Sequence, residues 1–357
     1  MPLVFQDHRQ DPAAWAKLLG VSRAAVDLYL ASDVIDLHVD TFIWDRTFGY
    51  DLTKRHGDGP FGARILGQAD LPRIREACIT GAIWVITTNP VRSASGRART
   101  FARNIERLRA TLASCEDDVA LVRDATEYAR AKASGKHAAF VGIQGGSALD
   151  AEGALDLIPD RLVIRITLVH LYNSSLGVTS SPVGGDGGLT ASGREYVRQL
   201  DARRIFVDLA HINRRGFFDA VEAHDPSLPL IVTHTGVSGV HEHWRNLDDP
   251  QLRAIADSGG TIGVMYHAPF LGEGDAGTHA SRVVDHLQHI VKTVGDDFAS
   301  LGSDWDGAIV TPRDMPTCLE LPRLVEQMLV RRMPEETIRK ILGGSYLRAL
   351  RLMRPAD

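Results

Sequence analysis

The chain of 357 residues contains three cysteines, and their number is odd. Cys78, Cys115 and Cys318 lie far apart and form no C-x-x-C motif. Neither a disulfide framework nor a cysteine-ligated zinc site is therefore indicated. An excess of basic residues is also missing, because the formal net charge is −5. Without a dense basic face, we expect neither nucleic acid nor an anionic membrane as a partner.

Long hydrophobic runs are absent as well. The longest uncharged stretches, near residues 77–91 and 258–272, are too short and too interrupted by glycine and proline to span a bilayer. The N-terminal segment carries charge throughout and lacks the apolar core and the cleavage site of a signal peptide. The C-terminal segment has no hydrophobic tail for a lipid anchor. These features predict a cytoplasmic protein.

What the chain does contain is a regular alternation of strand-like apolar runs and helix-like segments. The runs lie at 34–40, 79–89, 138–146, 162–170, 205–211, 230–235, 261–267 and 298–304. Such runs, separated by amphipathic helices, are typical of a parallel sheet covered by helices. Eight of them predict a (β/α)8 barrel, with extra N- and C-terminal helices, in a single domain over 1–357. An open α/β sheet is the alternative, although no G-x-G-x-x-G motif supports nucleotide binding.

Polar and ionisable side chains gather at the ends of these apolar runs. They are His38, Asp40, Gln144, His170, His211, His234 and Asp304. In a barrel the C-terminal ends of the strands meet at one mouth, where the chemistry of this fold takes place. Buried imidazoles and carboxylates are costly unless they are paired or bind a metal ion.

His38 and Asp40 are two residues apart, so both side chains point to the same face of a strand. One imidazole nitrogen and one carboxylate oxygen suit a divalent cation such as Zn²⁺. A His–Asp hydrogen bond in a core would produce the same pattern. His211 and His234 add two neutral nitrogens at the same mouth, and Asp304 adds a carboxylate. Together these five side chains predict a metal site.

Several motifs, in order, resemble the renal (membrane) dipeptidases, a family within the amidohydrolase-like metal hydrolases. The resemblance extends from about residue 34 to residue 307. It includes IDLHVDT at 35–41, QADLPRIREACITGA at 68–82, GIQGG at 142–146, ITLVHLYNSS at 166–175, GLTASGREYVRQLDARRIFVDLAH at 188–211, THTGV at 233–237, RNLDDPQLRAIADSGGTIGV at 245–264 and LGSDWDG at 301–307. It implies a (β/α)8 barrel that holds two zinc ions and cleaves dipeptides.

The resemblance also implies the metal ligands. His38 and Asp40 match the ligands of one zinc ion, and His211 and His234 match those of the other. The family's bridging glutamate is replaced by Gln144. A neutral amide can bind one cation but bridges two poorly, because the two cations repel each other. We therefore expect one firmly held metal at His38 and Asp40, and a weak or empty second site.

Three further residues match functional positions of the family. Asp304 matches the acid near the metal-bound water and is a further candidate ligand; it would pass a proton to the leaving amine. His170 matches the substrate-binding histidine and would donate a hydrogen bond to the oxyanion. Arg245 matches the arginine that holds the substrate carboxylate. The bound cation would bring the pKa of water toward neutrality.

The sequence therefore predicts a zinc-dependent dipeptidase with a small-molecule substrate. One alternative is a related amide hydrolase, such as an N-acyl amino acid deacylase. Another is a weakly active or inactive homologue that binds small peptides, for which Gln144 is the support. The retention of five polar side chains that are costly to bury argues against an inactive homologue. A homodimer is left open.

Overall fold

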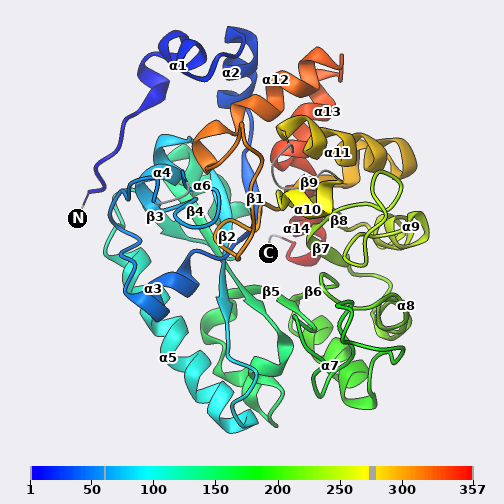
Figure 1. The fold of residues 1–357 in the computed structure, drawn as a ribbon. Helices are drawn as coiled ribbons and strands as arrows, with labels where there is room; N and C mark the ends of the chain where they lie inside the picture. Colours follow the sequence, from blue (N-terminus) through cyan, green and yellow to red (C-terminus); the bar gives the residue numbers. More distant parts are fainter. Residues whose placement is uncertain (1, 60–61, 273–278, 356–357) are drawn as a thin grey trace.

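The computed structural model describes residues 2–59, 62–272 and 279–355. Eight parallel strands form a closed barrel surrounded by helices (Figure 1). The strands are β1 (Ile35–Val39), β2 (Gly81–Thr87), β4 (His137–Gln144), β5 (Val163–Thr167), β6 (Phe206–Asp208), β7 (Ile231–Thr235), β8 (Thr261–Val264) and β9 (Ala299–Leu301). β1 pairs with both β2 and β9, and β2 pairs with β4, so the ring closes. The predicted (β/α)8 barrel is confirmed; seven of the predicted runs contain a strand, and β4 begins one residue before its run.

A ninth strand, β3 (Val119–Leu121), was not expected from the sequence. It pairs in parallel with the first three residues of β4, from His137 to Ala139. β5 joins the same strand later, from Val141 onward. β3 is therefore an addition to the rim of the barrel. A three-residue strand is too short to produce a recognisable period in the sequence.

The helices follow the strands and cover the outside of the barrel (Figure 1). Their bounds are α1 (Pro12–Leu19), α2 (Arg23–Leu30), α3 (Phe42–Phe48), α4 (Leu71–Glu76), α5 (Ala94–Ala113), α6 (Ala125–Ala133), α7 (Ala191–Ala202), α8 (Arg214–Ala223), α9 (Asp249–Asp257), α10 (Ala268–Leu271), α11 (Ala280–Val294), α12 (Pro322–Val330), α13 (Glu335–Arg339) and α14 (Ser345–Met353). Capping side chains accept backbone N–H groups at the start of α5, α7, α8 and α9: Ser93, Thr190, Asn213 and Asp248. Within the described residues, no helix is both long and apolar enough to cross a membrane.

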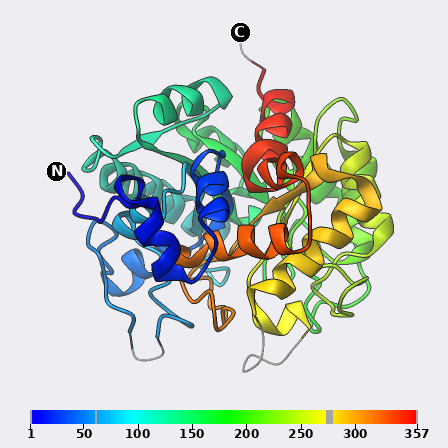
Figure 2. The same cartoon turned by 90° about the horizontal axis from the view of Figure 1, so that it is seen from above.

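The extra helices at the two ends of the chain pack against each other. α2 contacts α12, and both views show them side by side (Figures 1 and 2). The side chain of Glu326 on α12 accepts hydrogen bonds from the backbone N–H of Ser22 (2.9 Å) and from its hydroxyl (2.5 Å). The predicted N- and C-terminal helices therefore form one continuous layer on the barrel.

Helix α14 closes the N-terminal end of the barrel. Tyr346 packs against Phe140 of β4, with ring centroids 5.6 Å apart, and against Phe206 of β6, 6.4 Å apart. The buried Arg354 donates to four backbone carbonyls, including those of Arg204 (2.8 Å) and Val163 (2.7 Å) near the start of β6 and β5. Because this end is filled, the opposite end is left for a cavity.

Candidate metal centre

The structure brings the predicted polar residues together at the C-terminal end of the barrel. His38 lies within β1, His234 lies within β7, and Gln144 ends β4. The strands are shorter than the apolar runs, so His170, His211 and Asp304 each lie three residues beyond a strand. One cavity of about 280 Å³ contains six of the predicted positions: Asp40, Gln144, His170, His211, Arg245 and Asp304.

Two of these residues have unusual backbone conformations. His211 and Asp304 lie in the left-handed region, with φ of 68° and 65°. A residue with a Cβ atom is disfavoured there, at a cost on the order of 1–3 kcal/mol. Such strain gathers at functional sites. Here it occurs at His211 and Asp304 and also at Asp306 and Ala308, which line the same cavity, so we regard it as part of how the site is built.

The side chains of His38, His234 and Asp304 form a group that could hold a metal ion. One ligand atom from each lies within 4.8 Å of the others. His38 Nε2 and Asp304 Oδ1 are 3.5 Å apart, and neither has a hydrogen-bond partner in the described part of the chain. Leaving a buried polar atom unpaired costs roughly 1–3 kcal/mol. Because two nitrogens and a carboxylate oxygen match the ligand preference of zinc, these residues fit a divalent cation. Asp40, which the sequence paired with His38, lies outside this group.

His211 and His234 face each other across the same space. Their Nε2 atoms are 2.9 Å apart. The hydroxyl of Thr233 donates its proton to Asp208 (2.7 Å), so it accepts from Nδ1 of His234 (2.9 Å). His234 therefore carries its proton on Nδ1, and the lone pair of Nε2 points toward Nε2 of His211. This is the tautomer that binds a metal.

Arg165 is a site residue that the sequence analysis missed. This fully buried side chain on β5 donates from Nη2 to Nδ1 of His38 (2.8 Å) and lies 3.3 Å from a carboxylate oxygen of Asp208. Since a guanidinium only donates, a neutral His38 has its proton on Nε2, which faces Asp304. Gly142 makes room for Arg165, because a Cβ there would lie 2.6 Å from its Nε. The available signal was an arginine inside the apolar run 162–170.

Gln144 lies at the end of β4, beside His211. Its Nε2 lies 3.2 Å from Nε2 of His211, while its Oε1 is buried without a partner among the described residues. The amide oxygen is thus left as a neutral ligand atom, and the charge that a glutamate would bring is missing.

Burial pushes the ionisable groups of the site toward their neutral forms. It raises the pKa of Asp40 to about 6, against the hydrogen bond from Thr87. It also raises the pKa of Asp304 well above the usual range, and the charge of Asp40 adds to this shift. Burial lowers the pKa of His170 to about 4, and the charge of Arg245 adds to the lowering. A cation between these groups would stabilise the carboxylates and the neutral imidazoles.

Arg245 supplies a fixed positive charge in the cavity wall. It is 2% exposed, and Nη2 donates to the backbone carbonyl of His234 (2.7 Å). Burial lowers its pKa to about 10, while the charge of Asp304 favours the cation. The guanidinium thus stays charged at neutral pH, beside the metal ligands and the rings of Trp244 and Phe270.

The profile of the membrane dipeptidases, peptidase family M19, matches residues 22–355. The chain belongs to this family. Membership makes it a hydrolase of the M19 metallopeptidase family, and the resemblance found in the sequence is confirmed. It also agrees with the metal-ligating character of the barrel mouth.

Individual relatives support the same conclusion. An uncharacterized protein in the pqqA 5′ region of Klebsiella pneumoniae is 36% identical over 174 residues, or 48% of this chain; the match spans 63% of that relative. Dipeptidase tcpJ of Claviceps purpurea is 27% identical over 302 residues, and the match covers 80% of this chain and 69% of the tcpJ chain. The crystal structure of a Rhodobacter sphaeroides metallopeptidase, liganded with a phosphinate mimic of the dipeptide L-Ala-D-Ala, is 25% identical with a TM-score of 0.78. It covers 89% of this chain and 98% of that one.

Proposed function

We propose that this protein is a zinc-dependent dipeptidase. The observation that carries the proposal is the group of His38, His234 and Asp304, whose ligand atoms converge, together with the buried cation of Arg245, which lines the same cavity as Asp304. A metal-binding group alone would fit many hydrolases. The adjacent guanidinium adds a partner for the free carboxylate that every dipeptide has at its C-terminus.

The side chains of the cavity have distinct roles in this reaction. The bound cation would lower the pKa of water and polarise the scissile carbonyl. Asp304 takes a proton from the attacking water and passes it to the leaving amine, as the carbon–oxygen bond forms and the carbon–nitrogen bond breaks. His170, neutral at pH 7, donates a hydrogen bond to the developing oxyanion. Arg245 holds the substrate carboxylate and so orients the amide bond.

The direct test is turnover of a mixed panel by the zinc-loaded protein. The panel contains free dipeptides, their C-terminal amides and N-acyl amino acids, and the released amines are quantified. We expect free dipeptides to be cleaved fastest. Preferential cleavage of the N-acyl amino acids would favour the deacylase instead. No turnover of any member by protein with metal bound would refute hydrolysis.

Removing the cation at Arg245 should impair free dipeptides selectively. A charge-assisted contact contributes on the order of 1.5–3 kcal/mol, so Arg245→Ala should lower kcat/KM for free dipeptides roughly ten- to hundredfold. The C-terminal amides lack the charge and should lose far less. Steady-state rates on matched acid and amide pairs measure the difference. Equal losses on both would assign Arg245 another role.

A second candidate function is a metal-poor homologue that binds small peptides without turnover. The sequence supports it through Gln144, which brings no charge to the site, and the structure adds one observation: Arg165 places a guanidinium 2.8 Å from His38. A cation at His38 would be repelled by this charge and would compete with the proton on Nε2. If only one metal binds and Arg165 keeps His38 from ligating it, the ligands that remain of the group are His234 and Asp304, with Nε2 of His211 2.9 Å from Nε2 of His234; this location differs from the one expected from the sequence.

Restoring the carboxylate at Gln144 should change the metal content. We expect about one metal per wild-type chain and an increase toward two in Gln144→Glu, with faster dipeptide hydrolysis, because a charged bridge offsets the repulsion between two cations. Elemental analysis after gel filtration measures both. Gln144→Met, of similar size but without a ligand oxygen, is the control and should stay at or below one. Two tightly held metals in the wild type would contradict this account.

The location of the metal follows from a second pair of variants. His234→Ala should lose the metal, whereas His38→Ala should retain it if Arg165 keeps His38 from binding. The reverse result would restore the assignment to His38 and Asp40.

A further inference from the structure

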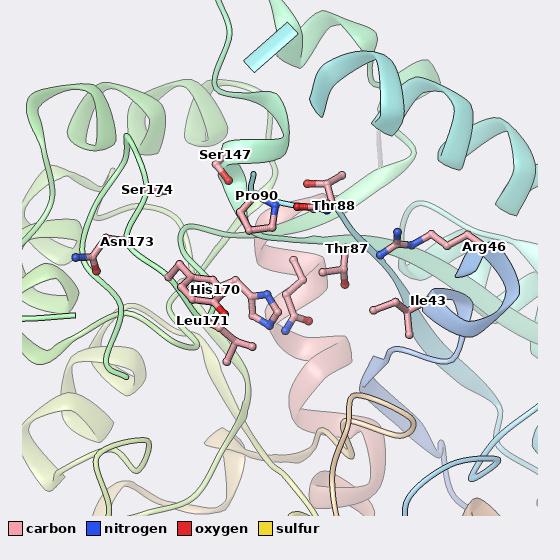
Figure 3. A pocket seen from close by; sticks show the side chains of 14 residues that line it. Ile43, Arg46, Thr87, Thr88, Pro90, Ser147, His170, Leu171, Asn173 and Ser174 are labelled. Atoms are coloured by element: carbon pink, nitrogen blue, oxygen red, sulfur yellow. The ribbon is translucent and has the colours of Figure 1, made fainter. Parts of the chain in front are cut away.

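A second cavity of about 280 Å³ adjoins the candidate metal centre (Figure 3). It shares four wall residues with the first cavity: Ile43, Gln144, His170 and Leu171. From there it extends along the loop after β2 and the loop after His170, whereas Arg245 lines the first cavity only. A substrate whose C-terminal carboxylate binds Arg245 would therefore place its amide between the cavities and its N-terminal residue in the second.

The second cavity has one permanently charged side chain among its fourteen wall residues, Arg46 of α3. Its guanidinium is directed toward Thr87 and the cavity (Figure 3). The Nε atom of Arg46 is buried without a hydrogen-bond partner, and the side chain forms no ion pair within the described residues. The other polar wall residues are neutral, mostly hydroxyl and amide groups: Thr87, Thr88, Asn89, Gln144, Ser147, His170, Tyr172, Asn173 and Ser174. No carboxylate among the described residues lines this cavity.

The charge of Arg46 is thus only weakly compensated by the protein. Burial lowers its pKa, and the charge of Asp40 opposes this shift, but Asp40 accepts its hydrogen bond from Thr87 and lines the first cavity. Arg92, the other charge that acts on Arg46, has the same sign. A half-buried cation without a bonded partner is stabilised by an anion that fills the cavity.

We propose that this cavity is a binding site for a carboxylate on the acyl side of the scissile amide, so that substrates with an acidic N-terminal residue are preferred. The proposal rests on the proposed dipeptidase function and specifies its substrate class. Arg46 and Arg245 would then hold the two carboxylates of one acidic dipeptide from opposite sides of the metal centre. The same carboxylate could belong to an acyl group without an α-amine, and the test separates these sources.

The test compares kcat/KM for Glu-Ala, Gln-Ala and N-glutaryl-alanine. Glu-Ala and Gln-Ala are nearly isosteric and differ in charge, and N-glutaryl-alanine is Glu-Ala without its amine. We expect the wild type to prefer Glu-Ala over Gln-Ala roughly ten- to hundredfold. Arg46→Met should bring this ratio close to one, and Arg46→Lys should retain part of it. Arg99→Met removes an exposed charge that neither lines the cavity nor acts on Arg46, and should leave the ratio unchanged.

The outcomes separate the proposal from its competitors. A ratio that Arg46→Met leaves unchanged would overturn it. An equal loss of kcat/KM for Glu-Ala and Gln-Ala would also overturn it. Arg46 would then act as a counter-ion that positions Asp40. Cleavage of N-glutaryl-alanine with the same dependence on Arg46 would support the site and identify the carboxylate, rather than the amino acid, as the recognised group.

Failure of the proposed function is distinguishable from failure of this inference. If the wild type cleaves no dipeptide, including Ala-Ala, dipeptidase activity is refuted. Calorimetric titration of the zinc-loaded protein with Glu-Ala and Gln-Ala then tests the site alone. Tighter binding of Glu-Ala that disappears in Arg46→Met supports the carboxylate site, and equal binding overturns it. Unchanged melting temperatures confirm that the variants are folded.

Discussion

Removal of the metal is expected to reduce dipeptide hydrolysis to background, and zinc, cobalt or manganese should restore it. The reason lies in the cavity wall. The described residues that line the cavity with Arg245 and Asp304 include no serine, threonine or cysteine, and the proposed mechanism therefore uses water as the attacking group. Water at neutral pH needs a divalent cation or a strong base to become nucleophilic. The histidines cannot replace the metal as an electrophile, because burial keeps His211 and His234 neutral.

Chelation followed by gel filtration, with elemental analysis before and after, is the measurement. The melting temperature of the metal-free protein shows whether lost activity reflects lost chemistry or unfolding. Re-addition of a redox-inactive metal, zinc, separates hydrolysis from any redox effect. Full activity in protein shown to be metal-free would refute the proposed mechanism.

Asp304→Asn is expected to lower kcat by roughly 10²- to 10⁴-fold, the contribution typical of a general acid–base group. The substitution keeps the size and an oxygen atom but removes the group that accepts and returns the proton. Asp304 is suited to this role because burial and the charge of Asp40 raise its pKa well above the usual range. Its Oδ1 also has no competing hydrogen bond within the described residues.

Two readouts separate proton transfer from a structural effect. Metal content shows whether Asp304→Asn still holds the cation, and kcat is compared at equal loading. Asp306→Asn is the matched control, because its carboxylate accepts from the backbone N–H of Gly67 (2.7 Å) and Gln68 (3.0 Å) and from Thr41 (2.7 Å). Asp306→Asn should lower the melting temperature more than it lowers kcat. Activity within tenfold of wild type in metal-loaded Asp304→Asn would assign the proton transfer to another group.

The barrel could be predicted because each strand is a continuous apolar run. A strand that is buried on both faces is recognisable from its own residues, without knowledge of the strands beside it. The ends of the strands were predicted less well. The runs continue to His170, His211 and Asp304, but the regular strands end three residues earlier; beyond them the pairing continues as individual backbone hydrogen bonds, such as that from the N–H of Asp304 to the carbonyl of His38 (3.0 Å). At His211 and Asp304 the backbone instead takes a left-handed conformation that apolar periodicity does not encode.

The convergence of the predicted residues at one mouth also followed from the sequence, since the C-terminal ends of parallel strands in a barrel share one end. Which residues become neighbours did not follow. His38 and Asp40 are close in the chain, yet the group that could hold a metal joins His38 to His234 and Asp304. That grouping depends on the registers of β1 with β9, of β9 with β8 and of β8 with β7, which no local spacing reveals.

By itself, then, the sequence determined the barrel, the family and the polar residues at the strand ends, because these depend on residue type and on order along the chain. Only the tertiary structure decided the environment of each charge. Arg165 is an isolated arginine in an apolar run until packing places it against His38 and Asp208. Arg46 is an ordinary helix residue until the loops after β2 and β5 enclose its guanidinium. Burial and pairing set the energy of a charge, and both arise from contacts between segments distant in sequence.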